Sequence, residues 1–174
     1  MRRIWISAVL VLLMAGAASV MGQRDSKMQS YLSAEGGFTV QFPAGSDVKQ
    51  DAEEVTLEDG GKSTLHEFSV DLDNDSISYM VMYNDYPAAS AMDAPQEVLA
   101  KTRDGALKDK TEISDLALDF NGIPGREFSA SDDNYTYTVR QFLKGKRLYQ
   151  LIVVCDKEKI AGLTSQFLNS FKFQ

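Results

Sequence analysis

The sequence predicts an α+β fold, in which a mainly antiparallel sheet is covered by helices on both faces as an α-β-α sandwich. Three observations predict this class. Several segments alternate apolar and polar residues with the period of strands, tight turns join neighbouring segments, and two further segments carry apolar stripes with helical spacing. The chain of 174 residues is 44% hydrophobic and 25% charged, which is ordinary for one globular domain.

The N-terminus has the pattern of a secretory signal peptide. Arg2 and Arg3 precede an apolar run at 4–14, and small residues follow it. The run is shorter than the ~20 residues of a membrane span. Cleavage after Gly22 and cleavage after Ala17 both fit the small residues, and an uncleaved anchor is the alternative.

These features divide the chain into three parts. We expect a signal peptide at 1–22, a flexible leader at 23–30 and a single α+β domain at 31–174. The mature protein is expected to be exported to the periplasm or the extracellular space. No stable membrane span is expected after the signal is cleaved.

The expected strands follow from alternation and from turn residues. Pro43 ends the first of them, and Asp59-Gly60-Gly61, Asp73-Asn74-Asp75 and Lys144-Gly145-Lys146 mark turns. Two strands, at 77–83 and 147–155, are apolar on both faces, which predicts central positions in the sheet. The strands are expected at 38–42, 48–57, 63–72, 77–83, 116–120, 126–130, 135–143 and 147–155.

Two helices complete the expected fold. The first begins near Asp93, which has capping-box spacing with Gln96. The second is capped by Asp156, and apolar residues at 160, 163, 167, 168 and 171 form its stripe. Its aromatic residues, Phe167 and Phe171, are expected to be buried against the sheet.

Several short motifs together resemble the PsbP-like family, whose namesake is an extrinsic protein of photosystem II. They are an early strand ending in Phe42-Pro43, a mid-chain helix, and a C-terminal strand pair followed by a helix ending in Ser170-Phe171. Gly-Ile-Pro-Gly-Arg-Glu at 122–127 and Arg-Leu-Tyr-Gln-Leu at 147–151 add to the likeness. The resemblance covers residues 30–173 and implies an α-β-α sandwich with a non-catalytic accessory role. No metal or photosystem contact transfers residue by residue.

Three kinds of site were considered: a catalytic histidine, a reactive cysteine and a calcium loop. The sequence does not favour any of them. The single histidine, His66, has no Gly-x-Ser-x-Gly nucleophile elbow to serve and is interpreted as a packed or edge residue. Cys155 ends an apolar strand and is interpreted as a small buried hydrophobe, with pairing between chains as the alternative. The aspartates at 71, 73 and 75 lack the glycine and glutamate of a calcium loop. The sequence therefore predicts no catalytic residue, cofactor or metal.

A basic cluster stands out in an acidic chain. The net charge is -7, which argues against free-standing nucleic-acid binding. We expect the cluster to contact a protein partner with an anionic surface, because a local patch can steer association. A charged turn that only keeps the sheet end soluble is the alternative. The candidate contact residues are Lys144, Lys146, Arg147, Arg140 and Arg126.

The function that these patterns favour is a non-catalytic exported accessory or interaction module. A small-ligand carrier with a pocket between helix and sheet is the alternative. A hydrolase is favoured less, because the partners that a nucleophile would need are missing.

Overall fold

The computed structural model describes residues 28–45, 47–56, 61–74, 76–86, 94–159 and 161–174. The expected signal peptide and both of its cleavage sites lie outside the described residues. Residues 28–30, which the sequence interpretation assigned to the leader, belong to the first strand. None of the helices in the described ranges is long and apolar enough to span a membrane.

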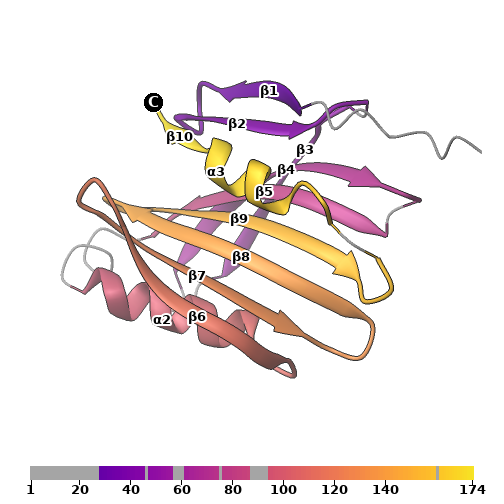
Figure 1. The fold of residues 1–174 in the computed structure, drawn as a ribbon. Coiled ribbons are helices and arrows are strands. Elements are labelled where there is room, and N and C mark those ends of the chain that lie inside the picture. The colour runs from indigo at the N-terminus through magenta and orange to yellow at the C-terminus, as the bar shows by residue number, and fades with distance from the viewer. Residues whose placement is uncertain (1–27, 46, 57–60, 75, 87–93, 160) are drawn as a thin grey trace, which may run out of the picture.

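A seven-stranded antiparallel sheet forms the centre of the described fold (Figure 1). Its order is β3-β4-β5-β9-β8-β7-β6, so the C-terminal hairpin β8–β9 lies beside β5 in the middle. The strands of this sheet are β3 Lys49–Thr56, β4 Lys62–Leu72, β5 Ile77–Asp85, β6 Thr111–Phe120, β7 Ile123–Ser131, β8 Tyr135–Lys144 and β9 Arg147–Asp156.

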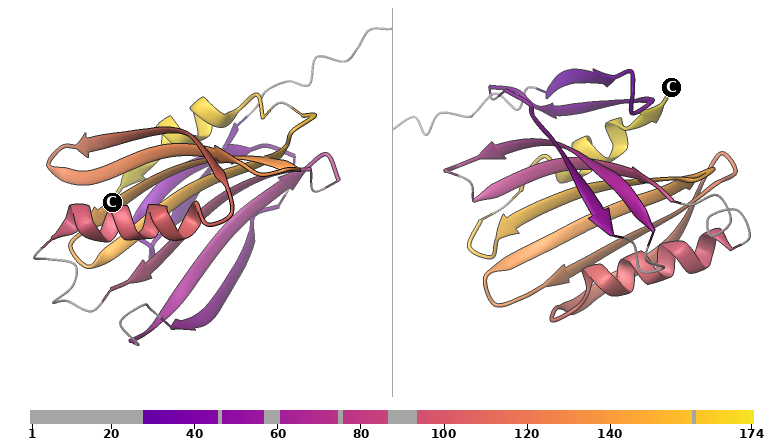
Figure 2. Two further views of the ribbon diagram at one scale, coloured as in Figure 1. Left: turned by 90° about the horizontal axis from the view of Figure 1, so that it is seen from below. Right: turned by 180° about the vertical axis from the view of Figure 1, so that it is seen from behind.

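A second, three-stranded sheet covers one face of the large sheet. It comprises β1 Met28–Ser33, β2 Phe38–Pro43 and β10 Lys172–Phe173, with β2 in the middle. The short helix α3 (Thr164–Ser170) lies beside this small sheet, whereas α2 (Pro95–Ala106) lies across the opposite face of the large sheet (Figure 2). β10 follows α3 directly and pairs with the start of β2, so the C-terminus closes the small sheet.

The expected sandwich with helices covering both faces is therefore wrong. The fold is mostly antiparallel sheet in two layers, and a sheet rather than a helix supplies much of the cover on one face. The physical reason is the alternation of β2, which places Phe38, Val40 and Phe42 in the core between the sheets. Local pattern identified this strand but could not show that it leaves the main sheet.

The main core lies between the two sheets and is rich in aromatic rings. Phe38 is fully buried and packs against Phe68 and Phe171, with ring centroids 5.5 and 5.6 Å away. Phe167 of α3 is also fully buried and contacts Tyr79. The expected burial of Phe167 and Phe171 is confirmed, since they are 0% and 4% exposed.

A smaller core lies under α2 on the other face. Val98 and Leu99 of the helix pack on Leu143 and Leu148 of the β8–β9 hairpin. The buried side chain of Gln141 donates a hydrogen bond of 2.8 Å to the carbonyl of Leu99. This contact fixes the helix on the same hairpin that carries the basic cluster.

Both helices differ from their expected boundaries. Asp156 ends β9 instead of capping a helix, and the chain turns before α3 begins at Thr164. Ala94 is the N-cap of α2 and makes no side-chain cap. Asp93, the expected start of this helix, lies outside the described residues.

Candidate functional site

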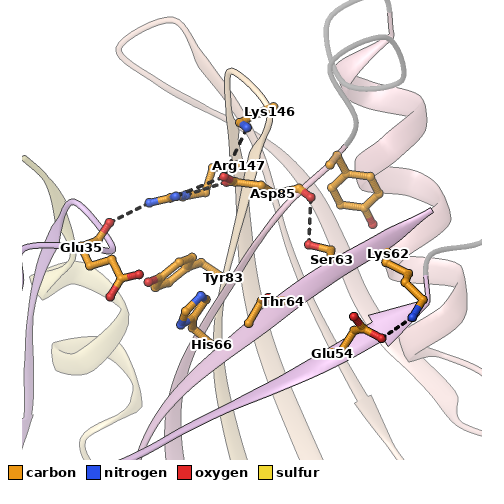
Figure 3. A pocket seen from close by; sticks show the side chains of 11 residues that line it. Glu35, Glu54, Lys62, Ser63, Thr64, His66, Tyr83, Asp85, Lys146 and Arg147 are labelled. Carbon is orange, nitrogen blue, oxygen red and sulfur yellow. Dashed lines mark hydrogen bonds and ion pairs between the residues drawn. The ribbon is translucent and has the colours of Figure 1, made fainter.

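The candidate site is a groove at the end of the large sheet, beside the turn of the β8–β9 hairpin. It lies between β3, β4, β5, β9 and the β1–β2 turn and has a volume of about 630 Å³. Figure 3 shows its side chains pointing toward a shared space. We call it the hairpin-end groove, and its lining residues are Glu35, Glu54, Lys62, Ser63, Thr64, His66, Tyr83, Asp85, Tyr86, Lys146 and Arg147.

Strand register brings distant residues together in this groove. His66 lies opposite Tyr83, and Asp85 lies opposite Arg147, although the last two are 62 residues apart in the chain. The turn between β8 and β9 holds Lys146 and Arg147 at this end of the sheet. Gly145 makes that tight turn with a φ of 61°, a conformation that favours glycine.

Arg147 is fixed by three different interactions. Its guanidinium donates to both carboxylate oxygens of Asp85, at 2.7 and 3.2 Å, and to the carbonyl of Glu35 at 2.9 Å. It also lies over the ring of Tyr83, 4.7 Å from the ring centroid. Arg147 therefore links β5, β9 and the β1–β2 turn.

Two cations share the carboxylate of Asp85. The ammonium of Lys146 lies 3.5 Å from Asp85 Oδ2, on the carboxylate that Arg147 already binds. Hydrogen bonding from Arg147, together with the charges of Arg147 and Lys146, holds the pKa of Asp85 below its ordinary value despite burial. These three side chains carry one net positive charge, which the Glu35 carboxylate at the same groove offsets.

Tyr83 is enclosed between a cation and an imidazole. His66 stacks on its ring with centroids 4.5 Å apart and an interplanar angle of 12°, and Arg147 lies over the same ring. Tyr83 is 2% exposed, and its hydroxyl has no hydrogen-bond partner among the described residues. Figure 3 shows the Glu35 side chain directed toward this hydroxyl. Burial and, secondarily, the charge of Glu35 raise the pKa of Tyr83.

The other three basic residues lie elsewhere. Arg140 pairs with Glu127 at 2.6 Å and donates to the carbonyl of Leu168 in α3. Arg126 shares the carboxylate of Asp115 with an arginine of α2. The structure therefore does not bring the five predicted contact residues into one patch.

Lys144 is the remaining member of the predicted cluster. Its ammonium lies 4.9 Å from the ring centroid of Phe173 and 3.3 Å from the carbonyl of Gln174. Only Lys146 and Arg147, of the five candidates, line the hairpin-end groove.

The residues considered for catalysis or metal binding have structural surroundings. Cys155 is 3% exposed, and burial followed by the charge of Asp156 raises the pKa of its thiol. Asp71 pairs with Lys49 and accepts a hydrogen bond from Ser78, while residue 75 lies outside the described ranges. Within the ranges that the structure describes, no group of three or more His, Cys, Asp or Glu could hold a metal.

Sequence reasoning missed Glu35, Tyr83 and Asp85 as parts of the groove. The alternation of β5 correctly put Tyr83 on a strand, but it gave no sign that Asp85 would meet Arg147. Only the pairing of β5 with β9 supplies that information. The signal that could have identified Asp85 is an acidic residue at the end of a strand expected to pair with the strand that follows the basic turn.

These layers define a PsbP-like fold. The solution structure of cyanobacterial PsbP (CyanoP) from Synechocystis sp. PCC 6803 matches with a TM-score of 0.52 and 14% identity, covering 91% of this chain and 99% of that one. The similarity therefore confirms the PsbP-like fold to which the sequence motifs pointed. No family model and no curated protein sequence matches the chain.

Two further solved structures are similar at a lower level. A crystal structure from Bacteroides thetaiotaomicron has a TM-score of 0.40 and 10% identity, covering 84% of this chain and 48% of that one. A protein of unknown function from Pseudomonas aeruginosa has a TM-score of 0.38 and 12% identity, covering 80% of this chain and 90% of that one.

Proposed function

We propose that the protein is an exported, non-catalytic accessory module that binds a protein partner with an anionic surface through the hairpin-end groove. The observation that carries the proposal is the convergence of Lys146 and Arg147 on the single carboxylate of Asp85 at the hairpin-end groove. Two cations on one carboxylate give a partner's acidic surface a defined place to dock in an acidic chain. Lys144 does not line the groove, but it is an exposed cation at the end of β8, beside the same turn.

The environments of the reactive side chains support a non-catalytic role. His66 stacks on Tyr83, and no hydrogen bond joins its imidazole to another described side chain that could activate it as a base. The raised pKa of the Cys155 thiol disfavours the thiolate that a nucleophile requires. The polar groove suits recognition of a surface rather than enclosure of a substrate.

A charge reversal tests the proposal. Lys144→Glu with Lys146→Glu should weaken capture of the native partner from envelope extract, mainly through slower association, and should reduce its salt dependence. The melting temperature should hardly change because both lysines are exposed. Lys157→Glu with Lys159→Glu is the matched control, since this exposed pair lies past the opposite end of β9. Equal capture by both double variants would refute the proposed surface.

Export is tested separately by intact-mass measurement on native protein. A mature chain that begins at Gln23, or at Ala18 after the alternative cleavage, is the expected result. Retention of Met1 in material from a membrane fraction would contradict export.

A second candidate function is a small-ligand carrier. A groove of about 260 Å³ lies between α3 and the large sheet, and Leu118, Phe120, Phe142 and Phe171 supply apolar side chains to it. This volume suits a small apolar group. Native mass spectrometry of the purified protein should then show a bound small molecule, and a mass equal to that of the bare chain would count against a carrier.

A further inference from the structure

We propose that the hairpin-end groove recognises a carboxylate side chain of the partner, which accepts a hydrogen bond from the Tyr83 hydroxyl and pairs with the Lys146 ammonium. This inference rests on the proposed function and names the chemical group that the groove takes.

The buried side-chain group of the groove that lacks a hydrogen-bond partner among the described residues is the Tyr83 hydroxyl. Tyr83 is 2% exposed and its hydroxyl has no partner among the described residues, although a buried hydroxyl normally has one. Two of the three acidic side chains that line the groove are engaged in ion pairs. Glu54 pairs with Lys62 at 2.5 Å, and Asp85 binds Arg147 and Lys146. The proton of the Tyr83 hydroxyl is therefore available to an acceptor that enters the groove when Glu35 moves aside.

Three cations and three carboxylates line the groove, so it is neutral while the Glu35 side chain occupies it. Lys62 pairs with Glu54, and Arg147 and Lys146 exceed Asp85 by one positive charge. When Glu35 moves aside, that excess selects an anion with a single negative charge. The side chain of Lys146 is 58% exposed, so an incoming group can reach its ammonium. A carboxylate matches this excess, whereas a phosphate dianion would bring a second charge toward Asp85 and Glu35.

Glu35 marks the place where that carboxylate would sit. Its side chain is exposed, points toward the Tyr83 hydroxyl in Figure 3, and makes no hydrogen bond or ion pair with another described residue. Only its backbone carbonyl is held, by Arg147. The side chain can therefore swing away while the β1–β2 turn stays in place. Until it does so, its negative charge repels an incoming anion.

This arrangement predicts substitutions with opposite effects. Tyr83→Phe removes the hydroxyl but keeps the ring between His66 and Arg147, so affinity for a carboxylate should fall by roughly 10-fold or more. Glu35→Gln removes the competing charge and should raise affinity several-fold. A purely structural role of the two residues would not give opposite signs. Tyr135→Phe, at an exposed tyrosine of β8, should have no effect.

The probe is the blocked peptide Ac-Ala-Glu-Ala-NH2, titrated into the mature chain and followed by the amide NMR signals of Thr64 and Lys146. The expected result is saturable shifts with the Glu peptide, none with Ac-Ala-Gln-Ala-NH2, weaker binding to Tyr83→Phe and tighter binding to Glu35→Gln. Equal binding of the Glu and Gln peptides would overturn the inference, as would preferential binding of inorganic phosphate. Binding of succinate without binding of the peptide would overturn the partner assignment and identify the source as a free small carboxylate.

Melting temperatures show whether a variant loses binding because it has unfolded. Tyr83→Phe removes an unpaired buried hydroxyl, so its melting temperature should equal or exceed that of the native protein. Loss of peptide binding with retained capture of the native partner would refute the carboxylate inference and leave the proposed function standing. If the peptide still binds but the Lys144 and Lys146 reversal has no effect on partner capture, the proposed function is refuted and carboxylate binding by the groove stands.

Discussion

Arg147 belongs to the framework of the groove as much as to its charge. Its guanidinium joins Asp85, the carbonyl of Glu35 and the ring of Tyr83, and its side chain is only 27% exposed. Lys146 makes one longer contact and is 58% exposed. Two adjacent basic residues thus differ in what they contribute, and sequence alone could not separate them because the difference depends on the partners across the sheet.

Arg147→Ala should lower the free energy of unfolding by about 1–2 kcal/mol, between the effects of exposed and buried ion pairs. The variant loses the ion pair with Asp85 and the hydrogen bond to the carbonyl of Glu35 in the β1–β2 turn. Urea unfolding measures it. Lys146→Ala is the control and should change stability by less than about 0.5 kcal/mol. Equal effects of the two substitutions would mean that Arg147 does not hold this end of the sheet.

Asp132 gives a residue-scale prediction on pH. Its carboxylate accepts hydrogen bonds from the Tyr137 hydroxyl at 2.6 Å and from the backbone N–H groups of Tyr135 and Asn134, which lower its pKa from 3.8 to about 2. A lowered folded-state pKa stabilises the fold above the unfolded value, and this contribution is lost as the pH falls from about 4 toward 2.

Removing the largest cause of this shift is the test. In Tyr137→Phe the pKa of Asp132 should move up toward its ordinary value, and the loss of stability between pH 4 and 2 should become smaller. A carbon-detected NMR titration of the Asp132 carboxyl measures the first effect, and urea unfolding at several pH values measures the second. An unchanged pKa in the variant would show that the backbone donors alone determine it.

At the scale of elements, the strands of the central sheet were predictable because their signals are local. Alternation over ten residues identified the β8 and β9 region, and Gly145 between two lysines identified its turn. β10 has only two residues, which is too short for any period, and it pairs with Thr39 and Phe38 at the other end of the chain. The small sheet therefore depends on a contact that no local pattern contains.

For the C-terminal helix, the sequence predicted which residues are buried but not where the helix begins. Its apolar positions were correct, because Phe167, Leu168 and Phe171 are buried, but the helix occupies only Thr164–Ser170. Turns follow Asp156, where the backbone N–H of Lys159 bonds to the carbonyl of Asp156. The apolar spacing continued through residues that do not form a helix, so the burial pattern was more reliable than the boundary.

Phe167→Ala should cost about 3–5 kcal/mol of unfolding free energy, the usual loss for a large core aromatic residue. Phe167 is fully buried, with its ring centroid 5.4 Å from those of Phe42 and Tyr79, so truncation leaves a cavity between the sheets. Gln166→Ala in the same helix is the exposed control and should change stability little. A loss below about 1 kcal/mol in urea unfolding would mean that α3 does not anchor the small sheet.

At the scale of the whole molecule, two layers of sheet leave one end of the β8–β9 hairpin facing the hairpin-end groove. Sequence reasoning predicted Lys146 and Arg147 as contact residues but also grouped them with Arg126 and Arg140, which lie in separate ion pairs. It could not identify Glu35, Tyr83 or Asp85, because their meeting depends on strand order and register. The groove therefore arises from the pairing of strands that are distant in the chain.

The most direct test of that proposal is site-specific photo-crosslinking. A benzophenone side chain at the exposed Thr64, which lines the groove, should crosslink the native partner in envelope extract. The yield of the crosslinked adduct should fall when Lys144 and Lys146 are also changed to Glu. The same probe at the exposed Thr111, on the far edge strand β6, should give no adduct. Equal adducts from both positions, or an adduct from Thr111 alone, would contradict the account that the hairpin-end groove is where this protein binds.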